Sequence, residues 1–256
     1  MMKRIILCGF NGVMGKKIQE LVAYHDDYVI VAGVDLNSSS SKIPVYKNIN
    51  DCQDEADVII NFSNPSSVKS VVEYALKNHL ALVEATTGLS EEDKTYLVDA
   101  AKKIPLLQSG NTSLGLNLMI CLAQQVAAVV GTNWEYEIIE EHHRRKIDAP
   151  SGAALMIANG INETLNQQLS YVYDRSSKRS ARDNHELGIS SIRGGNIVGT
   201  HKVKIISDNE ILEITHTALD RNLFAEGSLK AAEFILNNKP GKLYSMEDVI
   251  NLKKSV

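Results

Sequence analysis

The sequence predicts an α/β protein in which a doubly wound parallel sheet is followed by an α+β domain with an open mixed sheet. In the first half of the chain, short apolar runs alternate with segments of helical periodicity, which is typical of βαβ units. The first apolar run ends in a glycine-rich turn before a helical segment. After about residue 113 several β-rich runs follow one another instead, and this change marks the second domain.

The elements of the first domain are short and alternate between strand and helix. Each predicted strand is an apolar or β-branched run, and these runs lie at 4–8, 28–34, 58–62, 80–85 and 105–108. Helices are predicted where apolar residues recur every three or four positions, at 14–24, 65–78 and 90–102. Pro65 suits a first helical turn, and Ser90 with Asp93 resembles a capping pair.

The second domain mixes helices and strands. Predicted helices lie at 115–130 and 151–165, and predicted strands at 134–141, 187–193, 197–207 and 211–218. The polar segment 174–185 is expected to be a flexible loop, and a last helix at 222–237 is expected to return to the first domain. We therefore divide the chain into residues 1–113 with 219–256, and residues 114–218. An open sheet in the second domain would have edges that pairing with another copy could cover.

Composition disfavours several classes of protein. The chain has 256 residues, a net charge of -4 and 44% hydrophobic residues, which is typical of a soluble protein without a broad basic surface for nucleic acid. Three scattered cysteines are too few for a disulfide framework or a zinc site, and they indicate a reducing compartment. No leader precedes Arg4, and no apolar run approaches the ~18 residues that span a bilayer. We therefore expect a cytoplasmic protein that binds neither nucleic acid nor membrane.

Gly9, Gly12 and Gly15 lie between the first strand and the first helix, where small residues let the backbone approach a pyrophosphate. Alone, three glycines are a weak signal, since a tight turn explains them equally well. Asp35 strengthens the signal because it closes the next strand about 20 residues later, where a Rossmann-like domain binds the adenosine ribose. The pattern therefore predicts a dinucleotide-binding domain.

The residue after Asp35 bears on the choice of dinucleotide. It is Leu36, not an arginine that could hold a 2′-phosphate, so the sequence favours NADH over NADPH. Lys16 and Lys17 lie close in sequence and could support a phosphate, but a solvated face of the first helix is the simpler interpretation.

Two histidines, two arginines and a lysine occupy the five positions from His142 to Lys146 in an acidic chain. Such a cluster is either a solvated surface run or a pocket for a multiply charged anion. A helix start near Ser151 favours the pocket, because the N–H groups of Gly152 and Ala153 would add to it. The site suits a small dicarboxylate. The two adjacent histidines should point in different directions, which disfavours a shared metal site.

With the glycine loop and this segment in view, the chain resembles the dihydrodipicolinate reductase family over nearly its whole length. The residues that carry the resemblance are His142-His143-x-x-Lys146-x-Asp148-x-Pro150-Ser151-Gly152, Ala85 to Gly88, Gly115-Leu116-Asn117, Arg193-Gly194-Gly195 and Gly199-x-His201. The resemblance implies NAD(P)H-dependent reduction of 4-hydroxy-tetrahydrodipicolinate, via dihydrodipicolinate, to tetrahydrodipicolinate on the diaminopimelate route to lysine. It also implies a homotetramer built through the sheet of the second domain, and no metal.

The resemblance further implies roles for individual residues. His142 is expected to donate or accept a proton, and Lys146 to act as general acid. The substrate carboxylates would be held by His143, Ser151, Gly152 and Ala153. The dinucleotide would be held by Gly9, Phe10, Asn11, Gly12, Val13, Met14 and Asp35, and its nicotinamide half, at the domain junction, by Ala85, Thr86, Thr87, Ser109, Gly110, Asn111 and Thr112.

Three positions depart from the family pattern. Ala85 stands where the family has glycine, and its methyl group is expected to limit the approach of the cofactor. Thr112 stands where many relatives have an aromatic residue, and Ala153 replaces a threonine that would donate to the substrate. The remaining charged candidates fit either an anion site or the surface, as with Arg144, Arg145 and Arg193, or are expected to be structural, as with His185, His201 and His216.

Two other functions stay open. Another NAD-dependent dehydrogenase of similar architecture would have no need of a dicarboxylate substrate. A non-catalytic, dinucleotide-sensing protein should have lost Lys146 or the histidines, and here both remain.

Overall fold

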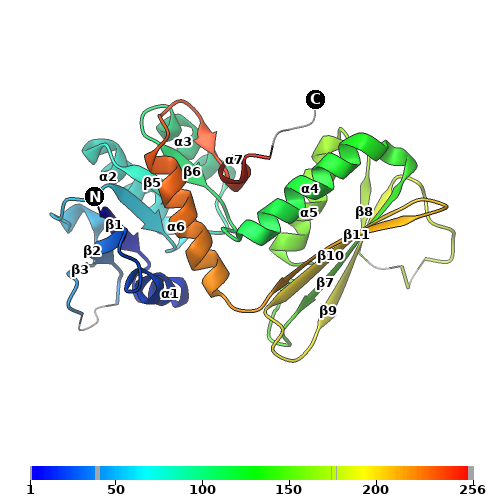
Figure 1. Ribbon diagram of the computed structural model, residues 1–256, viewed down its shortest axis with the longest axis horizontal. Coiled ribbons are helices and arrows are strands. Elements are labelled where there is room, and N and C mark those ends of the chain that lie inside the picture. Colours follow the sequence, from blue (N-terminus) through cyan, green and yellow to red (C-terminus); the bar gives the residue numbers. More distant parts are fainter. Residues whose placement is uncertain (1, 38–40, 174, 177, 253–256) are drawn as a thin grey trace. The chain divides into compact units, whose positions relative to one another are not determined.

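The protein consists of two compact units (Figure 1). The computed structural model describes residues 2–37, 41–173, 175–176 and 178–252. The first unit is formed by Met1–Leu114 and Arg221–Asn251, and the second is built on Gly115–Asp220. The chain therefore completes most of the first unit, forms the second, and then returns to the first.

The first unit is a parallel sheet in the strand order β12-β6-β5-β4-β1-β2-β3. All of its strand pairs are parallel, so the prediction of a doubly wound parallel sheet is confirmed. The strands are β1 (Lys3–Cys8), β2 (Tyr28–Val34), β3 (Val45–Tyr46), β4 (Val58–Asn61), β5 (Ala81–Glu84), β6 (Leu106–Gln108) and β12 (Leu243–Tyr244).

Helices cover both faces of this sheet. Because side chains alternate along a strand, Ile5 and Leu7 of β1 pack in the core under α1 (Val13–Val22) and α6 (Asn222–Leu236). Ile6 faces the other way, into the core under α2 (Val68–Asn78) and α3 (Glu91–Ala101). This double burial explains why the strands of the first unit are continuous apolar runs rather than alternating ones.

The helix boundaries of the first unit follow the local signals. Ser90 and Asp93 form the predicted capping box at the start of α3, where each side chain bonds to the other residue's backbone N–H. The segment predicted to start at Pro65 begins as a 3-10 turn, η2 (Pro65–Ser67), before α2. Two further short elements, η1 (Ile49–Asp51) and α7 (Met246–Ile250), were not predicted.

The second unit is a mixed sheet, as predicted, and its strand order is β11-β10-β7-β9-β8. Neighbours pair antiparallel from β11 to β7 and parallel from β7 to β8. The strands are β7 (Glu135–His142), β8 (Ser170–Val172), β9 (Glu186–Arg193), β10 (Gly199–Ile206) and β11 (Ile211–Ala218). The helices α4 (Leu114–Val130) and α5 (Gly152–Thr164) bury one face of this sheet in a common apolar core (Figure 1).

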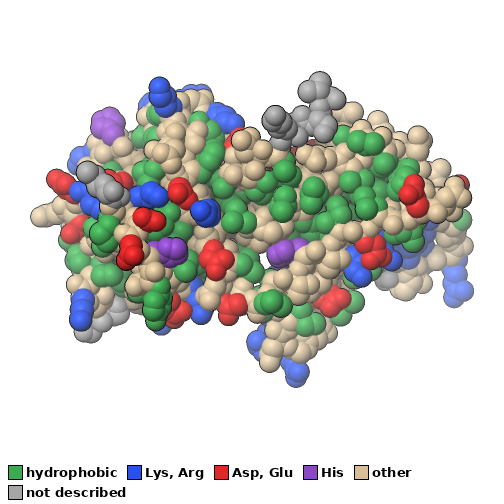
Figure 2. All heavy atoms as spheres, in the orientation of Figure 1, with side chains coloured by type: hydrophobic (Ala, Val, Ile, Leu, Met, Phe, Trp, Pro, Cys, Tyr) green, Lys and Arg blue, Asp and Glu red, His purple; other side chains and the backbone are tan. Residues whose placement is uncertain are grey.

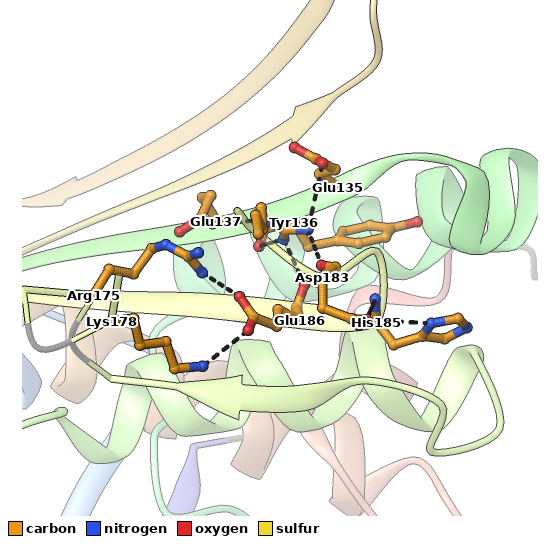
Figure 3. A network of polar contacts seen from close by, with 9 residues as sticks. Glu135, Tyr136, Glu137, Arg175, Lys178, Asp183, His185 and Glu186 are labelled. Atoms are coloured by element: carbon orange, nitrogen blue, oxygen red, sulfur yellow. Dashed lines mark hydrogen bonds and ion pairs between the residues drawn. The ribbon is translucent and has the colours of Figure 1, made fainter. Parts of the chain in front are cut away.

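The predicted loop 174–185 forms no helix or strand in its described residues, and positions 174 and 177 lie outside them. Several of its cations nevertheless bind the sheet (Figure 3). Arg175 and Lys178 both pair with the carboxylate of Glu186 at the start of β9, Lys178 at 2.9 Å. The guanidinium of Arg182 bonds to the Glu137 carboxylate of β7 at 3.1 Å. Ion pairs therefore connect the described part of this loop to β7 and β9.

Helix α4 corrects one expectation. Together with the following turn it spans Leu114–Asn133, a 20-residue segment with an 18-residue window of mean hydropathy 1.7, which is long and apolar enough to cross a membrane. The expectation that no segment approaches this length was therefore wrong. Buried core helices share such composition, and the buried side of α4 belongs to the core of the second unit. Its other side exposes Leu118, Leu122 and Val129. Figure 2 shows apolar side chains gathered on the surface over α4.

Candidate functional site

The glycine loop connects β1 to α1 and needs glycine for the fold itself. Gly9 has a φ of +79°, and a Cβ there would lie 2.6 Å from the carbonyl oxygen of Phe62. A Cβ on Gly15 would lie 2.2 Å from the carbonyl oxygen of Gly9. Helix α1 begins directly after Gly12, which makes no side-chain cap. The loop therefore presents a helix N-terminus at the carboxyl end of β1, as an anion site requires.

Asp35 connects the end of β2 to this loop. One carboxylate oxygen accepts the backbone N–H of Asn11 at 2.9 Å, and the other accepts that of Asn37 at 2.9 Å. Each oxygen keeps a further lone pair that a ribose hydroxyl can use. The ring of Phe10 is buried, and only a glycine at position 33 leaves room for it. The structure thus brings Asp35 and the loop backbone together, with the Phe10 side chain in the core.

The segment after β5 contains the next candidates, Ala85 to Thr87. Ala85 is only 5% exposed, so its methyl group lies in the protein interior and not on the surface of the sheet edge. The buried carboxyl of Glu84 accepts the backbone N–H of Thr86 at 2.9 Å and the side-chain amide of Asn61 at 2.7 Å. Burial raises the pKa of Glu84, against the effect of these hydrogen bonds. Glu84 therefore anchors the start of this segment.

The loop after β6 contains Ser109, Gly110, Asn111 and Thr112. Because β5 and β6 are neighbours, this loop and the one after β5 leave the same edge of the sheet. Thr112 is buried, and its hydroxyl donates to the carbonyl of Phe224 in α6 at 2.7 Å. The structure therefore turns the Thr112 side chain toward α6.

In the second unit, β7 ends at His142 beside a buried ion pair. The Nδ1 atom of His142 lies 2.5 Å from the carboxylate of Glu140, two residues earlier on the same face of the strand. Glu140 is completely buried. Arg193, at the end of the neighbouring strand β9, donates to both of its oxygens, at 2.9 and 2.7 Å. The backbone N–H of Ser151 also donates to Glu140, at 3.2 Å.

The charges of this cluster follow from burial and pairing. Burial alone would raise the pKa of Glu140, but the hydrogen bonds from Arg193 and its neighbours outweigh burial and lower that pKa to about 2. Burial lowers the pKa of His142, and the Glu140 carboxylate only partly opposes this effect. At neutral pH Glu140 is therefore an anion that faces the guanidinium of Arg193.

Helix α5 begins where predicted, with Ser151 as its N-cap. The Ser151 hydroxyl accepts the N–H of Ala154 at 3.1 Å and lies 3.2 Å from Nε2 of His201 in β10. Gly152 is exposed and Ala153 is half-buried, so the first turn of the helix opens toward the surface. Burial lowers the pKa of His201 to about 4, which keeps its ring neutral beside Ser151.

The predicted basic segment divides into inner and outer groups. His142 is buried, whereas Arg144 and Arg145 are exposed. Lys146 lies between these extremes, with its Nζ atom 2.9 Å from the Asp148 carboxylate. His143 is half-buried. The segment is therefore neither a uniform surface run nor a pocket of five cations.

A metal centre has no support among the residues that the structure describes, since none of their His, Cys, Asp and Glu side chains form a group of three or more that could hold one.

Comparison with known proteins identifies the family. The profile for the N-terminal region of dihydrodipicolinate reductase matches residues 3–112, and that for the C-terminal region matches residues 115–250. The chain belongs to the dihydrodipicolinate reductase family. The 4-hydroxy-tetrahydrodipicolinate reductase of Caldanaerobacter subterraneus subsp. tengcongensis is 44% identical, over 98% of this chain and 99% of that protein. The enzyme of the same name from Clostridium tetani is 41% identical, over 98% of each.

The fold agrees with this assignment to the dihydrodipicolinate reductase family. The dipicolinate-bound dihydrodipicolinate reductase from Paenisporosarcina sp. TG-14 superposes with a TM-score of 0.81, over 97% of this chain and 99% of that one, at 23% identity. The N-terminal half of the chain is accordingly a nucleotide-binding domain of the family.

Three residues of the cluster were not among the site residues predicted from the sequence. Glu140 lacked a role, Arg193 was left between anion binding and surface, and His201 was expected to be structural. The two-residue spacing of Glu140 and His142 on a strand could have placed their side chains on one face. Nothing in the sequence could have shown that β9 and β10 bring Arg193 and His201 to the same place.

Proposed function

We propose that the chain catalyses the reduction of 4-hydroxy-tetrahydrodipicolinate, via dihydrodipicolinate, to tetrahydrodipicolinate in the diaminopimelate route to lysine. The observation that carries this proposal is the cluster at the end of β7, where His142 and Lys146 stand near the open start of α5. Membership of the family supports it, as do the curated relatives of that name. Dipicolinate in a solved relative supports a cyclic dicarboxylate as the class of ligand.

The substrate carboxylates are assigned to the first turn of α5. Backbone N–H groups and the positive end of a helix dipole bind anions, and here Gly152 leaves that turn exposed. Ser151 caps this turn, and we assign the half-buried His143 to the carboxylates as well. The Ser151 hydroxyl already caps the helix and contacts His201. We therefore assign two roles to Ser151: it holds the turn in place, and its hydroxyl shares a hydrogen bond with the substrate. Ala153 contributes its N–H alone.

Proton transfer is assigned to His142 and Lys146. A bound reduced nicotinamide supplies the hydride, so the chain itself has to provide a proton and positive charge for the developing enamine-like centre. Lys146 is an ammonium whose partner, Asp148, is mostly exposed and can be exchanged for substrate. Burial lowers the pKa of His142 and the Glu140 carboxylate opposes this effect only in part, so the neutral ring is favoured and can accept a proton.

The dinucleotide is assigned to the loop Gly9–Met14 and to Asp35, with the segments Ala85–Thr87 and Ser109–Thr112 for its nicotinamide half. The open N-terminus of α1 and the free lone pairs of Asp35 fit such a ligand. We propose a preference for NADH over NADPH. Asp35 would repel a 2′-phosphate, and Lys17 is engaged with Glu20 at 3.2 Å.

We further propose a cytoplasmic homotetramer assembled through the sheet of the second unit. β11 is an edge strand of that sheet, and Ile211 and Leu212 on it are exposed. The three cysteines are buried and form no disulfide among the described residues, as suits a reducing compartment. Sedimentation equilibrium of the purified chain would measure its mass in solution, and a monomer at micromolar concentration would contradict the assembly.

The activity is tested with the purified protein, NADH and the freshly formed condensation product of pyruvate and aspartate semialdehyde. We expect consumption of reduced nicotinamide that depends on all three components, with NADPH used less efficiently. Dipicolinate should inhibit competitively against the substrate. A folded protein that oxidises neither NADH nor NADPH under these conditions would overturn the proposal, and equal use of both would remove only the assigned preference.

A further inference from the structure

Glu140 is a carboxylate deep inside the second unit, and the reaction assigned above does not use it. It is completely buried, and the Ser191 side chain contributes a hydrogen bond to it beside four further donors. These are two N–H groups of Arg193 on β9, the backbone N–H of Ser151 before α5, and Nδ1 of His142 on its own strand. A buried carboxylate with this many donors stays ionised. Each group that contacts this carboxylate must therefore carry a hydrogen on the contacting atom.

We propose that Glu140 and Arg193 form a positioning pair that fixes the proton of His142 on Nδ1 and leaves Nε2 as the atom that exchanges protons with the substrate. An ionised carboxylate accepts hydrogen bonds and cannot donate them. At 2.5 Å from Glu140, the Nδ1 atom must therefore carry its hydrogen in every state of the ring. The neutral imidazole then has its lone pair on Nε2, and the second proton can be taken up or released only there.

The surroundings of Nε2 support this division of labour. A Cβ built on Gly199, the first residue of β10, would lie 3.0 Å from Nε2 and 3.4 Å from Cδ2 of His142. Any side chain at position 199 would therefore crowd the free nitrogen. The φ of Gly199 is not in the left-handed region, so the backbone does not require glycine there. With glycine at this position, no side chain of residue 199 occupies the space beside Nε2.

Arg193 connects the surroundings of His142 to those of Lys146. Besides Glu140, its guanidinium donates to the backbone carbonyl of Asp148 at 2.7 Å. The Asp148 side chain in turn holds the ammonium of Lys146. One guanidinium therefore fixes the carboxylate that orients His142 and the turn that carries Lys146. A lysine in its place could not make both contacts, because it lacks the planar fork of donors.

The groups that face the His142 ring come from four segments. They are Glu140 on β7, Arg193 on β9, His201 on β10 with ring centroids 5.2 Å apart, and Lys146 in the turn after β7. Of these, only Glu140 favours the protonated ring, because the others are cationic or become so. Removing the charge of Glu140 should therefore lower the pKa of His142 as well as release its tautomer.

The first test is nuclear magnetic resonance of ring-labelled histidine in the whole protein without substrate. In the wild type near neutral pH we expect His142 with its hydrogen on Nδ1. In Glu140→Gln the amide can donate to Nδ1, so we expect the hydrogen on Nε2 and a lower pKa. The matched control is Glu141→Gln, one residue along β7 with its side chain on the opposite face of the sheet; it should leave both properties unchanged. A wild-type ring protonated on Nε2 would overturn the inference directly.

The second test is kinetic and rests on the proposed function. Glu140→Gln should lower kcat by roughly tenfold to a hundredfold, with the KM for dinucleotide unchanged and the His142 limb of the pH profile moved to lower pH. Glu141→Gln should match the wild type. Full activity of Glu140→Gln with an unshifted profile contradicts the positioning role.

A second variant covers the case in which Glu140→Gln does not fold. Gly199→Ala keeps the Glu140–Arg193 pair and adds one methyl group beside Nε2. We expect it to keep the Nδ1 hydrogen and to lose kcat by about tenfold or more. An unchanged kcat would show that Nε2 is not the working atom. If the wild type fails to turn over the assigned substrate, the proposed function fails, while the tautomer measurement still decides the role of Glu140.

Discussion

At the scale of single residues, Lys146 and its neighbours differ in their exposure and in their side-chain partners. Arg144 and Arg145 are exposed, and the Arg145 guanidinium donates a hydrogen bond to the side chain of Asn196 at 3.0 Å. Lys146 is more enclosed and reaches Asp148 from inside the turn. The same run of basic residues therefore contains cations that differ in how far they are exposed.

Replacing Lys146 with alanine should lower kcat by about 10²-fold or more, because in the proposed reaction its ammonium would supply a proton and stabilise developing negative charge. Dinucleotide binding, measured by fluorescence titration, should stay within about twofold of the wild type. Arg145→Ala is the matched control, since it removes a cation from the adjacent position. Turnover of Lys146→Ala at the wild-type rate would remove the assigned role.

Ala153 offers a substitution that should improve substrate binding rather than impair the enzyme. Its N–H belongs to the first turn of α5, and restoring a hydroxyl there should give the substrate carboxylate one more donor. A hydrogen bond to a charged group contributes about 1.5–3 kcal/mol, so Ala153→Thr should lower the substrate KM by tenfold or more. Ala153→Val has nearly the same shape without the hydroxyl and should not. Equal KM values for both variants would place the carboxylates elsewhere.

The predicted site residues illustrate what a sequence can and cannot reveal about a site. Ser151 and Gly152 were placed correctly at a helix start because a proline and a serine before an apolar periodic run are local signals. Arg193 on β9, which bonds to Glu140, and His201 on β10, whose ring contacts that of His142, lie more than fifty positions further along the chain. Such contacts depend on strand order, and strand order leaves no local signal.

At the scale of helices and strands, long periodic segments were predicted well. β2 and β11 have the predicted boundaries, and the predicted helices occur within a few residues of their expected ends. β3, β8 and β12 were missed because two or three residues cannot show alternation. They form at sheet edges, where the neighbouring strand supplies the hydrogen bonds.

Gly227 in the middle of α6 provides a test at this scale. Glycine to alanine inside a helix normally stabilises by about 1 kcal/mol. Here a Cβ would lie 1.7 Å from the carbonyl oxygen of Thr112, so the loop and the helix would have to separate. Gly227→Ala should therefore destabilise the first unit by about 2 kcal/mol or more in urea unfolding. Glu226→Ala, at the exposed neighbouring position, should change stability by less than about 0.5 kcal/mol. A stabilised Gly227→Ala would show that the close packing is wrong.

At the scale of the whole molecule, buried histidines make stability depend on pH. Burial lowers the pKa of His201 to about 4, from 6.5 in an unfolded chain. The unfolded state therefore binds the proton first, and stability falls as the pH drops from about 6.5 to about 4. His201 alone accounts for about 3 kcal/mol over this range. Glu140, whose pKa is about 2, loses its contribution only below about 4.5.

Chemical unfolding between about pH 7 and pH 4 would measure this fall. His201→Asn should be less stable near neutral pH because Ser151 loses its partner, but its stability should decline less steeply with acid. His185→Asn is the control, since that ring is largely exposed. Parallel curves for His201→Asn and the wild type would show that His201 does not remain neutral in the folded protein.

The close packing of Thr112 on α6 suggests that the second unit can be removed without unfolding the first. On the first unit's side, Thr112 bonds to Phe224 across the place where residues 115–220 are inserted. On the second unit's side, Gly115 at the start of α4 touches His216 near the end of β11. The second unit is thus an inserted domain. The chain segments that flank it lie close together in the first unit, and its own two ends lie close together in the second. Splicing position 114 to 221 through a short linker should leave a folded dinucleotide-binding unit without reductase activity. A chain that stops at Leu114 should not fold, because it lacks α6 and the apolar face that α6 covers.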